Sequence, residues 1–105
     1  MPQFTVYKNR NPVTKARVPY LLDVQSDLLG SLDTRVVIPF YAAGTLKGQA
    51  MTVLMPRFEI EGKDCVLMTP QLAGIASKEL GAAVADLSDH RDAIIAAIDL
   101  LVTGI

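Results

Sequence analysis

The sequence contains few of the side chains that catalytic and metal sites require. Its 105 residues include one cysteine, Cys65, and one histidine, His90. A lone cysteine excludes an intrachain disulfide and favours a reducing, cytoplasmic location. One histidine and one cysteine are too few for a zinc site, and His90 has no nucleophile or base beside it in a recognisable motif. Gly44 and Gly48 lack the Lys-Ser/Thr that follows a phosphate-binding loop. We therefore predict no catalytic residues, no metal and no cofactor.

Basic charge and long apolar runs are also scarce. The formal net charge is −1, so the chain has no positive surplus with which to neutralise a phosphate backbone, and direct binding of nucleic acid by this chain alone is not expected. No charged leader followed by an apolar run opens the sequence. The apolar tail from Ala93 is interrupted by Asp99 well short of a membrane span. We expect a soluble cytoplasmic protein that does not contact membranes.

The most regular segment present is the C-terminal one. Apolar residues recur there at the i, i+4, i+7 spacing of one helix face, at Ile94, Ile98, Leu101 and Ile105. Ser88 is the expected N-cap and Gly104 the expected end. The polar ridge of this predicted helix is narrow for a chain of this length. It is therefore either a core helix with a thin solvated edge, or a helix with an apolar surface left for a second copy or another partner.

Short strand patterns precede this helix. Glu61 to Asp64 form a turn between two of them, which predicts a hairpin. Pro39 is expected to end its strand or to mark an edge, residues 41–50 read as loop, and residues 77–84 as a short helical turn interrupted by Gly81. We predict one domain, residues 1–105, mostly β with a C-terminal α-helix. Strands are expected at residues 3–7, 20–25, 35–38, 58–60 and 65–69.

Two adjacent leucines, Leu28 and Leu29, fall in the turn-like stretch 26–31. Successive side chains cannot easily share one buried side, so at least one of the two is expected to be exposed. A second unusual stretch is the basic loop from Lys8 to Arg17. Residues 1–20 carry four basic side chains and no acidic one, which is typical of a solvated loop.

Several motifs, in order from end to end, resemble those of the CcdB toxins of bacterial toxin–antitoxin modules. The matching stretches are Gln3-Phe4-Thr5-Val6-Tyr7, Asp23-Val24-Gln25-Ser26-Asp27-Leu28-Leu29, Val37-Ile38-Pro39, Val84-Ala85-Asp86-Leu87-Ser88, Ala97-Ile98 and Gly104-Ile105. The resemblance implies an SH3-like antiparallel β-barrel with a C-terminal helix, assembled as a homodimer. Two copies of the helix would then face a two-fold symmetric target.

The resemblance also implies a function. Such toxins bind the A subunit of DNA gyrase and trap the enzyme on cleaved DNA, and they are not enzymes. The family's gyrase-contacting positions fall on Phe4, Ser26, Leu28, Leu29, Asp99, Thr103, Gly104 and Ile105. A CcdA-like antitoxin would neutralise the toxin with a disordered, charged segment that folds on binding, and the complex would reach operator DNA only through the antitoxin. We expect antitoxin contacts at Lys8, Arg10, Arg17, Asp23, Gln25 and Asp27.

The chain departs from the best-known members of the family at its end. Those members close with Trp-Gly-Ile and carry Asn four residues before the Trp, whereas this chain has Thr103 and Asp99 and resembles chromosomal members ending in Thr-Gly-Ile. Loss of an aromatic hot spot removes a contact worth about 2 kcal/mol. Two alternatives stay open: an RNA endonuclease of the same barrel class, which would need a basic or acid–base groove, and a non-toxic remnant that only binds antitoxin.

Overall fold

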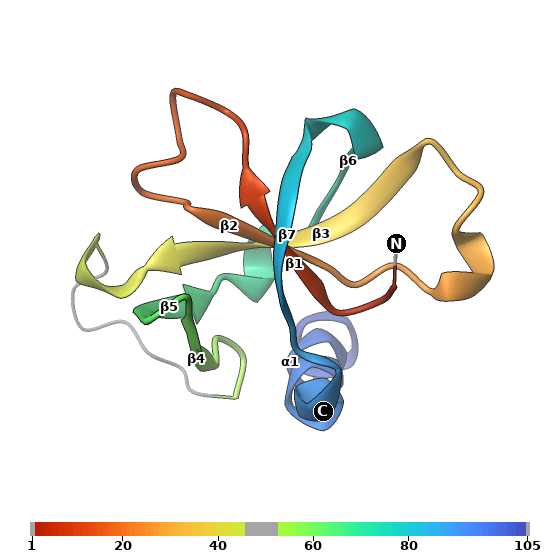
Figure 1. Ribbon diagram of the computed structural model, residues 1–105. Coiled ribbons are helices and arrows are strands. Elements are labelled where there is room, and N and C mark those ends of the chain that lie inside the picture. The colour runs from red at the N-terminus through yellow and green to blue at the C-terminus, as the bar shows by residue number, and fades with distance from the viewer. Residues whose placement is uncertain (1, 46–52, 105) are drawn as a thin grey trace.

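The fold is a strongly curled antiparallel sheet with a C-terminal helix beneath it (Figure 1). The computed structural model describes residues 2–45 and 53–104, and Ile105 lies outside these ranges. The helix α1 spans Arg91–Thr103. A mostly-β half-barrel with a C-terminal helix is therefore confirmed. The strands are β1 Thr5–Asn9, β2 Tyr20–Asp23, β3 Thr34–Ala42, β4 Arg57–Ile60, β5 Lys63–Leu67, β6 Ala73–Ala76 and β7 Leu80–Asp86.

Five short 3₁₀ turns connect these elements within the described residues. They are η1 Asp27–Leu29, η2 Ala43–Thr45, η3 Thr69–Gln71, η4 Ser77–Glu79 and η5 Ser88–His90. The strands are ordered β4-β5-β3-β2-β1-β7, and β6 pairs with β3 off this path. Of the loop expected at 41–50, only 41–45 is described, and its first two residues belong to β3.

The long strand β3 is the centre of the sheet. It pairs with β2 on one side, and on the other it pairs first with β6 and then with β5. The prediction that Pro39 ends its strand or marks an edge is wrong, because β3 continues to Ala42 and has paired strands on both sides. The carbonyl of Pro39 accepts a hydrogen bond from Met68 N at 2.9 Å, so its missing N–H faces the gap between β6 and β5. Proline is tolerated there because no ladder bond needs that donor.

Strand β7 replaces most of the predicted helical turn. Only Ser77–Glu79 form a 3₁₀ turn, and Leu80 to Asp86 pair antiparallel with β1. The two strands approach so closely at Gly81 that a Cβ there would lie 2.8 Å from the Lys8 carbonyl oxygen. Gly81 thus permits the pairing of β7 with β1, and this distant pairing outweighs the weak local preference of an alanine-rich segment.

The predicted hairpin is confirmed as β4–β5, but its turn is shorter than the predicted Glu61 to Asp64, because Lys63 and Asp64 already belong to β5. Its two turn residues, Glu61 and Gly62, both have positive φ, at 53° and 78°, as in the type I′ turns that suit strand twist. Glu61 is held in this conformation partly by its side chain, since its Oε1 accepts a hydrogen bond from the Tyr20 hydroxyl at 2.6 Å. The contact joins the hairpin to β2.

The core lies between the curled sheet and α1. Its main cluster includes Phe4, Val6, Phe40, Leu67 and Ile94, and a smaller cluster on the other side of β1 contains Tyr7 with Val37 and Leu80. Strand β1 is therefore buried on both faces, and not on one face as its alternating pattern predicts. Within the sheet, β1 lies between β2 and β7. One face of β1 packs in the main cluster and the other face packs in the smaller cluster.

The helix differs at its start from the prediction and agrees at its end. Ser88 does not cap it: η5 intervenes, and α1 begins at Arg91. Gly104 ends it in a left-handed conformation with φ 75°, as predicted. The helix is 13 residues long, and none of the described helices has the length and apolar character needed to cross a membrane.

Candidate functional site

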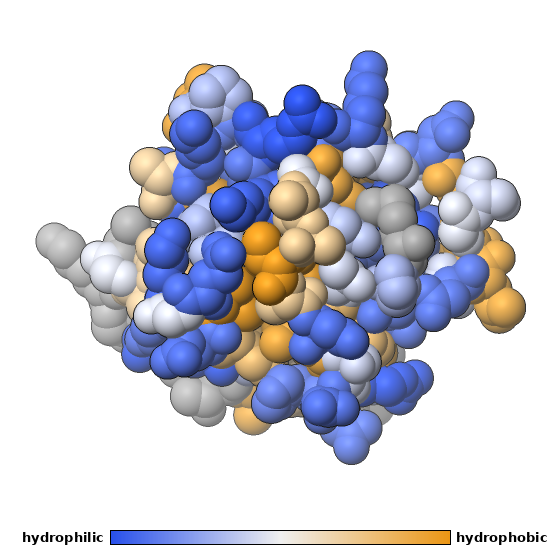
Figure 2. All heavy atoms as spheres, viewed as in Figure 1, coloured by the Kyte–Doolittle hydropathy of each residue, from blue (hydrophilic) through white to orange (hydrophobic). Residues whose placement is uncertain are grey.

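The turn η1 presents apolar side chains to solvent. Leu28 is 94% exposed and Leu29 49%, so the prediction that at least one is exposed is confirmed. The turn is closed by Leu29 N donating to Ser26 O at 2.9 Å, while Leu28 N donates to the Ser26 hydroxyl at 3.2 Å. Figure 1 shows the turn standing out at the side of the sheet, and apolar atoms reach the surface at that edge in Figure 2. An ordered turn therefore carries an exposed apolar surface.

A buried polar network lies behind this turn. The Asp23 carboxylate and the Arg35 guanidinium form an ion pair with Nη2–Oδ2 at 2.7 Å, and both side chains are almost fully buried. The other carboxylate oxygen of Asp23 accepts a hydrogen bond from Gln25 N at 3.0 Å. The Gln25 amide then donates to Leu29 O at 2.9 Å and accepts from Val36 N at 3.0 Å. The network connects the turn to β3.

Two of the residues that the sequence predicts as antitoxin contacts are internal in the isolated chain. Asp23 is 0% exposed and Gln25 is 5% exposed, and their polar atoms bond to groups within the chain. Their side chains form no surface for a partner. Asp27 is exposed, but its Oδ1 accepts a hydrogen bond from Gln3 N at 2.8 Å. The structure therefore places Asp23 and Gln25 as supports of the turn.

Phe4 is also internal, although it was expected at the gyrase contact. Its side chain is 2% exposed, and its backbone has the unusual positive φ of 69°. Phe4 N donates to Asp23 O at 2.6 Å, and Phe4 O accepts from Leu87 N at 2.9 Å. A residue other than glycine keeps such a conformation only where its surroundings enforce it. Phe4 thus joins the segment before the turn to the segment before α1.

The outer side of α1 is the second apolar surface. The helix buries Ile94 and Ala97, whereas Val102 is 74% exposed and Leu101 38%. Of the residues predicted here as contacts, Asp99, Thr103 and Gly104 are all exposed, and Ile105 lies outside the described residues. The Thr103 hydroxyl donates to Asp99 O at 2.7 Å. The helix thus has a narrow buried face and an unpaired apolar flank at its C-terminal end.

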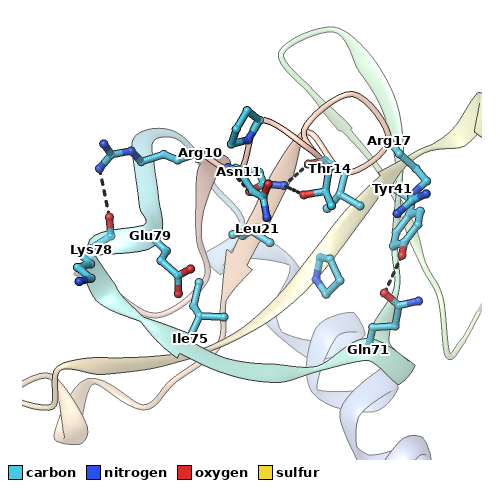
Figure 3. A pocket seen from close by; sticks show the side chains of 14 residues that line it. Arg10, Asn11, Thr14, Arg17, Leu21, Tyr41, Gln71, Ile75, Lys78 and Glu79 are labelled. Atoms are coloured by element: carbon cyan, nitrogen blue, oxygen red, sulfur yellow. Dashed lines mark hydrogen bonds between the residues drawn. The ribbon is translucent and has the colours of Figure 1, made fainter.

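A groove of about 850 Å³ opens on another part of the surface (Figure 3). Leu21, Pro39 and Ile75 supply apolar surface, and Arg10, Arg17, Lys78 and Glu79 supply charge. The Arg10 guanidinium donates to Lys78 O at 3.1 Å, which joins the basic loop to η4. The fold therefore brings Arg10 and Arg17, two of the predicted antitoxin contacts, to one groove. Lys8 instead lines a separate, smaller cavity beside Tyr20 and Lys63.

Asn9, the last residue of β1, connects the basic loop to the sheet. The Asn9 amide donates to Val18 O at 2.8 Å and to the Thr14 hydroxyl at 3.0 Å. This contact fixes the loop that carries Arg10 and Arg17. On the far wall of the groove, the Tyr41 hydroxyl donates to the Gln71 side chain at 2.7 Å. The groove is therefore shaped by contacts between distant segments, which no local motif reveals.

The comparison with protein families agrees with this geometry. Residues 3–104 match the family described as the CcdB protein, so the match covers nearly the whole chain. The chain belongs to the CcdB family. As a CcdB toxin it is a member of a toxin–antitoxin system, and CcdB toxins act by binding a protein target rather than by catalysis. Within residues 2–45 and 53–104, no group of three or more His, Cys, Asp or Glu side chains is arranged to hold a metal ion.

Sequence reasoning missed several residues that shape these surfaces of the CcdB chain. Arg35 forms the buried ion pair with Asp23, while Lys78 and Tyr41 line the groove. Arg35 precedes a β-branched run and reads as an ordinary residue of an expected strand. Its burial at 1% exposure is the informative feature, because a charged side chain is almost never fully buried unless it is paired. The sequence alone does not show that burial.

Proposed function

We propose that this CcdB toxin binds the A subunit of DNA gyrase and traps the complex of gyrase with cleaved DNA, which inhibits replication and transcription. The observation that supports this most strongly is the exposure of Leu28 and Leu29 on a hydrogen-bonded turn. A leucine that passes from water into an interface contributes about 1.5–3 kcal/mol. Because the turn is already ordered, little of that energy would be spent on ordering it.

The remaining gyrase contacts in this proposal lie at the end of α1, on Asp99, Thr103, Gly104 and Ile105. Thr103 stands where the best-known members of the family have an aromatic residue, and its hydroxyl bonds to the helix backbone. Apolar anchoring therefore falls to Leu28, Leu29 and Ile105. Ser26 and Phe4 contribute by holding the turn, through the hydrogen bonds described above.

We further propose that the protein is a homodimer when it binds gyrase. The exposed Leu101 and Val102 leave apolar area on α1 for a second copy or for the target. A two-fold symmetric pair of toxins would present each contact twice to a two-fold symmetric enzyme. Matched symmetry raises the overall affinity without any new type of contact.

In the same proposal, a CcdA-like antitoxin neutralises the toxin by laying an acidic segment across the groove. Arg10, Arg17 and Lys78 would attract its carboxylates, and the apolar surface of Leu21 and Ile75 would take an apolar side chain. The formal net charge of −1 gives the chain no overall positive charge with which to attract DNA. Co-repression of the operon would then occur through the antitoxin.

The proposed function is tested with purified protein, gyrase and plasmid DNA. We expect inhibited supercoiling and accumulation of linear plasmid. Deletion of residues 103–105 should leave the circular dichroism spectrum unchanged, because Thr103 and Gly104 are exposed, and should abolish inhibition. Unchanged inhibition by the truncated protein would refute the assignment of the end of α1 to the gyrase contact.

Two outcomes would favour the alternative functions. Cleavage of added RNA without an effect on gyrase would favour the endonuclease alternative. Normal growth on expression without antitoxin would favour a non-toxic remnant.

The antitoxin groove is tested by charge reversal. Arg17→Glu should weaken binding of an acidic CcdA-like peptide by at least about tenfold, and it should flatten the salt dependence of binding. Lys15→Glu is the matched control, since Lys15 lies on the same loop and is exposed but lines the other cavity. Equal losses in the two variants, measured by isothermal titration calorimetry, would argue against a site in this groove.

A further inference from the structure

We propose that a buried polar chain running from Arg35 through Asp23 to Gln25 positions the turn η1 for gyrase binding. This inference rests on the proposed function, and it makes these three residues positioning residues that never touch gyrase. All three are at most 5% exposed. They act on Leu28 and Leu29 through the backbone of the turn.

The turn cannot hold its own position through packing. It is three residues long, and none of them is buried. Its internal bonds close one tight turn, from Leu29 N to Ser26 O and from Gly30 N to Asp27 O, but they do not attach the turn to the sheet. Asp27 Oδ1 accepts a hydrogen bond from Gln3 N at 2.8 Å, which attaches the start of the turn to the segment before β1. The Gln25 amide attaches the end of the turn, because it bonds to Leu29 O on one side and to Val36 N of β3 on the other. Gln25 thus connects the turn to the central strand.

The ion pair behind Gln25 sets the orientation of this connection. Two nitrogens of Arg35 contact the same oxygen of Asp23, with Nε–Oδ2 at 2.9 Å and Nη2–Oδ2 at 2.7 Å. The other oxygen, Oδ1, is left to accept from Gln25 N. A buried ion pair is commonly no more stabilising than an apolar replacement of the same size. Its use directly behind an exposed turn therefore points to positioning rather than to stability.

The consequence for binding follows from populations. If gyrase binds only the positioned turn, the apparent dissociation constant is the intrinsic one divided by the fraction of molecules in which the turn is in place. Loss of the Gln25 bridge that lowers this fraction to about a tenth or a hundredth would weaken binding about 10- to 100-fold. The chemistry of Leu28 and Leu29 would be unchanged.

The test is a pair of amide-to-carboxylate substitutions. Gln25→Glu removes the donor to Leu29 O at nearly constant shape. Asn9→Asp is the matched control, because the Asn9 amide likewise donates to a loop carbonyl, that of Val18 at 2.8 Å, but on the basic loop. Each variant is measured for thermal stability, for hydrogen exchange of the turn amides by NMR, and for affinity toward the gyrase A subunit by calorimetry. Gln25→Met, which lacks the charge, is used if Gln25→Glu does not fold.

We expect the Gln25 variant to exchange the turn amides faster and to bind gyrase about 10- to 100-fold more weakly, while Asn9→Asp binds gyrase like the wild type. Equal losses of affinity in both variants, or wild-type affinity in the Gln25 variant, would overturn the inference and leave the proposed function intact. Failure of the wild type to bind gyrase would overturn the proposed function, and the inference with it. A merely structural role would lower stability without this selective loss of affinity.

Discussion

Leu28→Ala separates the role of the turn in binding from its role in folding. Leu28 is 94% exposed in the isolated chain, so its truncation leaves no cavity and removes no buried contact. Exposed substitutions of this kind change the free energy of unfolding by less than about 0.5 kcal/mol. The midpoint of urea denaturation should therefore stay close to that of the wild type.

The effect on gyrase binding should be much larger. Truncation to alanine removes roughly three carbon-sized groups, and each is worth about 0.8 kcal/mol when it is buried against a partner. A loss of about 2.4 kcal/mol corresponds to a dissociation constant about 60-fold higher. The turn is connected to β3 through Gln25, so it has little freedom to compensate by moving a neighbouring side chain into the contact.

The assay is calorimetric titration of the gyrase A subunit, with Val13→Ala as the control. Val13 is 88% exposed, nearly as much as Leu28, but lies on the basic loop. Its truncation should alter neither stability nor gyrase affinity. Wild-type affinity in Leu28→Ala would refute the assignment of the turn to gyrase. If Val13→Ala weakened gyrase binding as much as Leu28→Ala does, the affinity would depend on exposed apolar area in general and not on the turn.

Three further predictions concern folding and titration. Gly81→Ala should lower the free energy of unfolding by about 1–3 kcal/mol, because the new Cβ would lie 2.8 Å from a backbone oxygen of β1. Gly74→Ala is the control, since a Cβ there would have nothing within 4 Å, and it should leave the midpoint of urea denaturation nearly unchanged. Burial and the hydrogen bond to Glu61 raise the pKa of Tyr20 from 10.0 to about 12. The unfolded chain therefore loses this proton first, so stability should fall as pH rises from about 10 to about 12. Tyr20→Phe should remove this part of the pH dependence of the urea midpoint. Burial raises the pKa of the Cys65 thiol, so a thiol reagent should label Cys65 only when the protein unfolds. Rapid labelling of the native protein would contradict the burial of Cys65 in the core.

Features that depend on neighbouring residues were predictable from the sequence. The hairpin follows from Glu61 and Gly62, and the end of α1 follows from Gly104, because turn and cap geometries are set within a few residues. The exposure of Leu28 and Leu29 also follows locally, since successive side chains point in different directions. The family was recognisable for a related reason. Its motifs are short stretches of sequence, and they can be identified without knowing which residues contact one another in the fold.

Features that depend on distant contacts were decided by the tertiary structure. Strand β7 forms because β1 is available to pair with it, and β3 passes through Pro39 because two different strands meet there. The same holds for the site. The sequence predicted Asp23 and Gln25 as antitoxin contacts, but only the fold shows that both are buried, with Asp23 paired to Arg35 and Gln25 bonded to Leu29 O and Val36 N. Burial depends on how the whole chain folds. It decides whether a polar side chain is accessible to a partner or forms its hydrogen bonds within the chain.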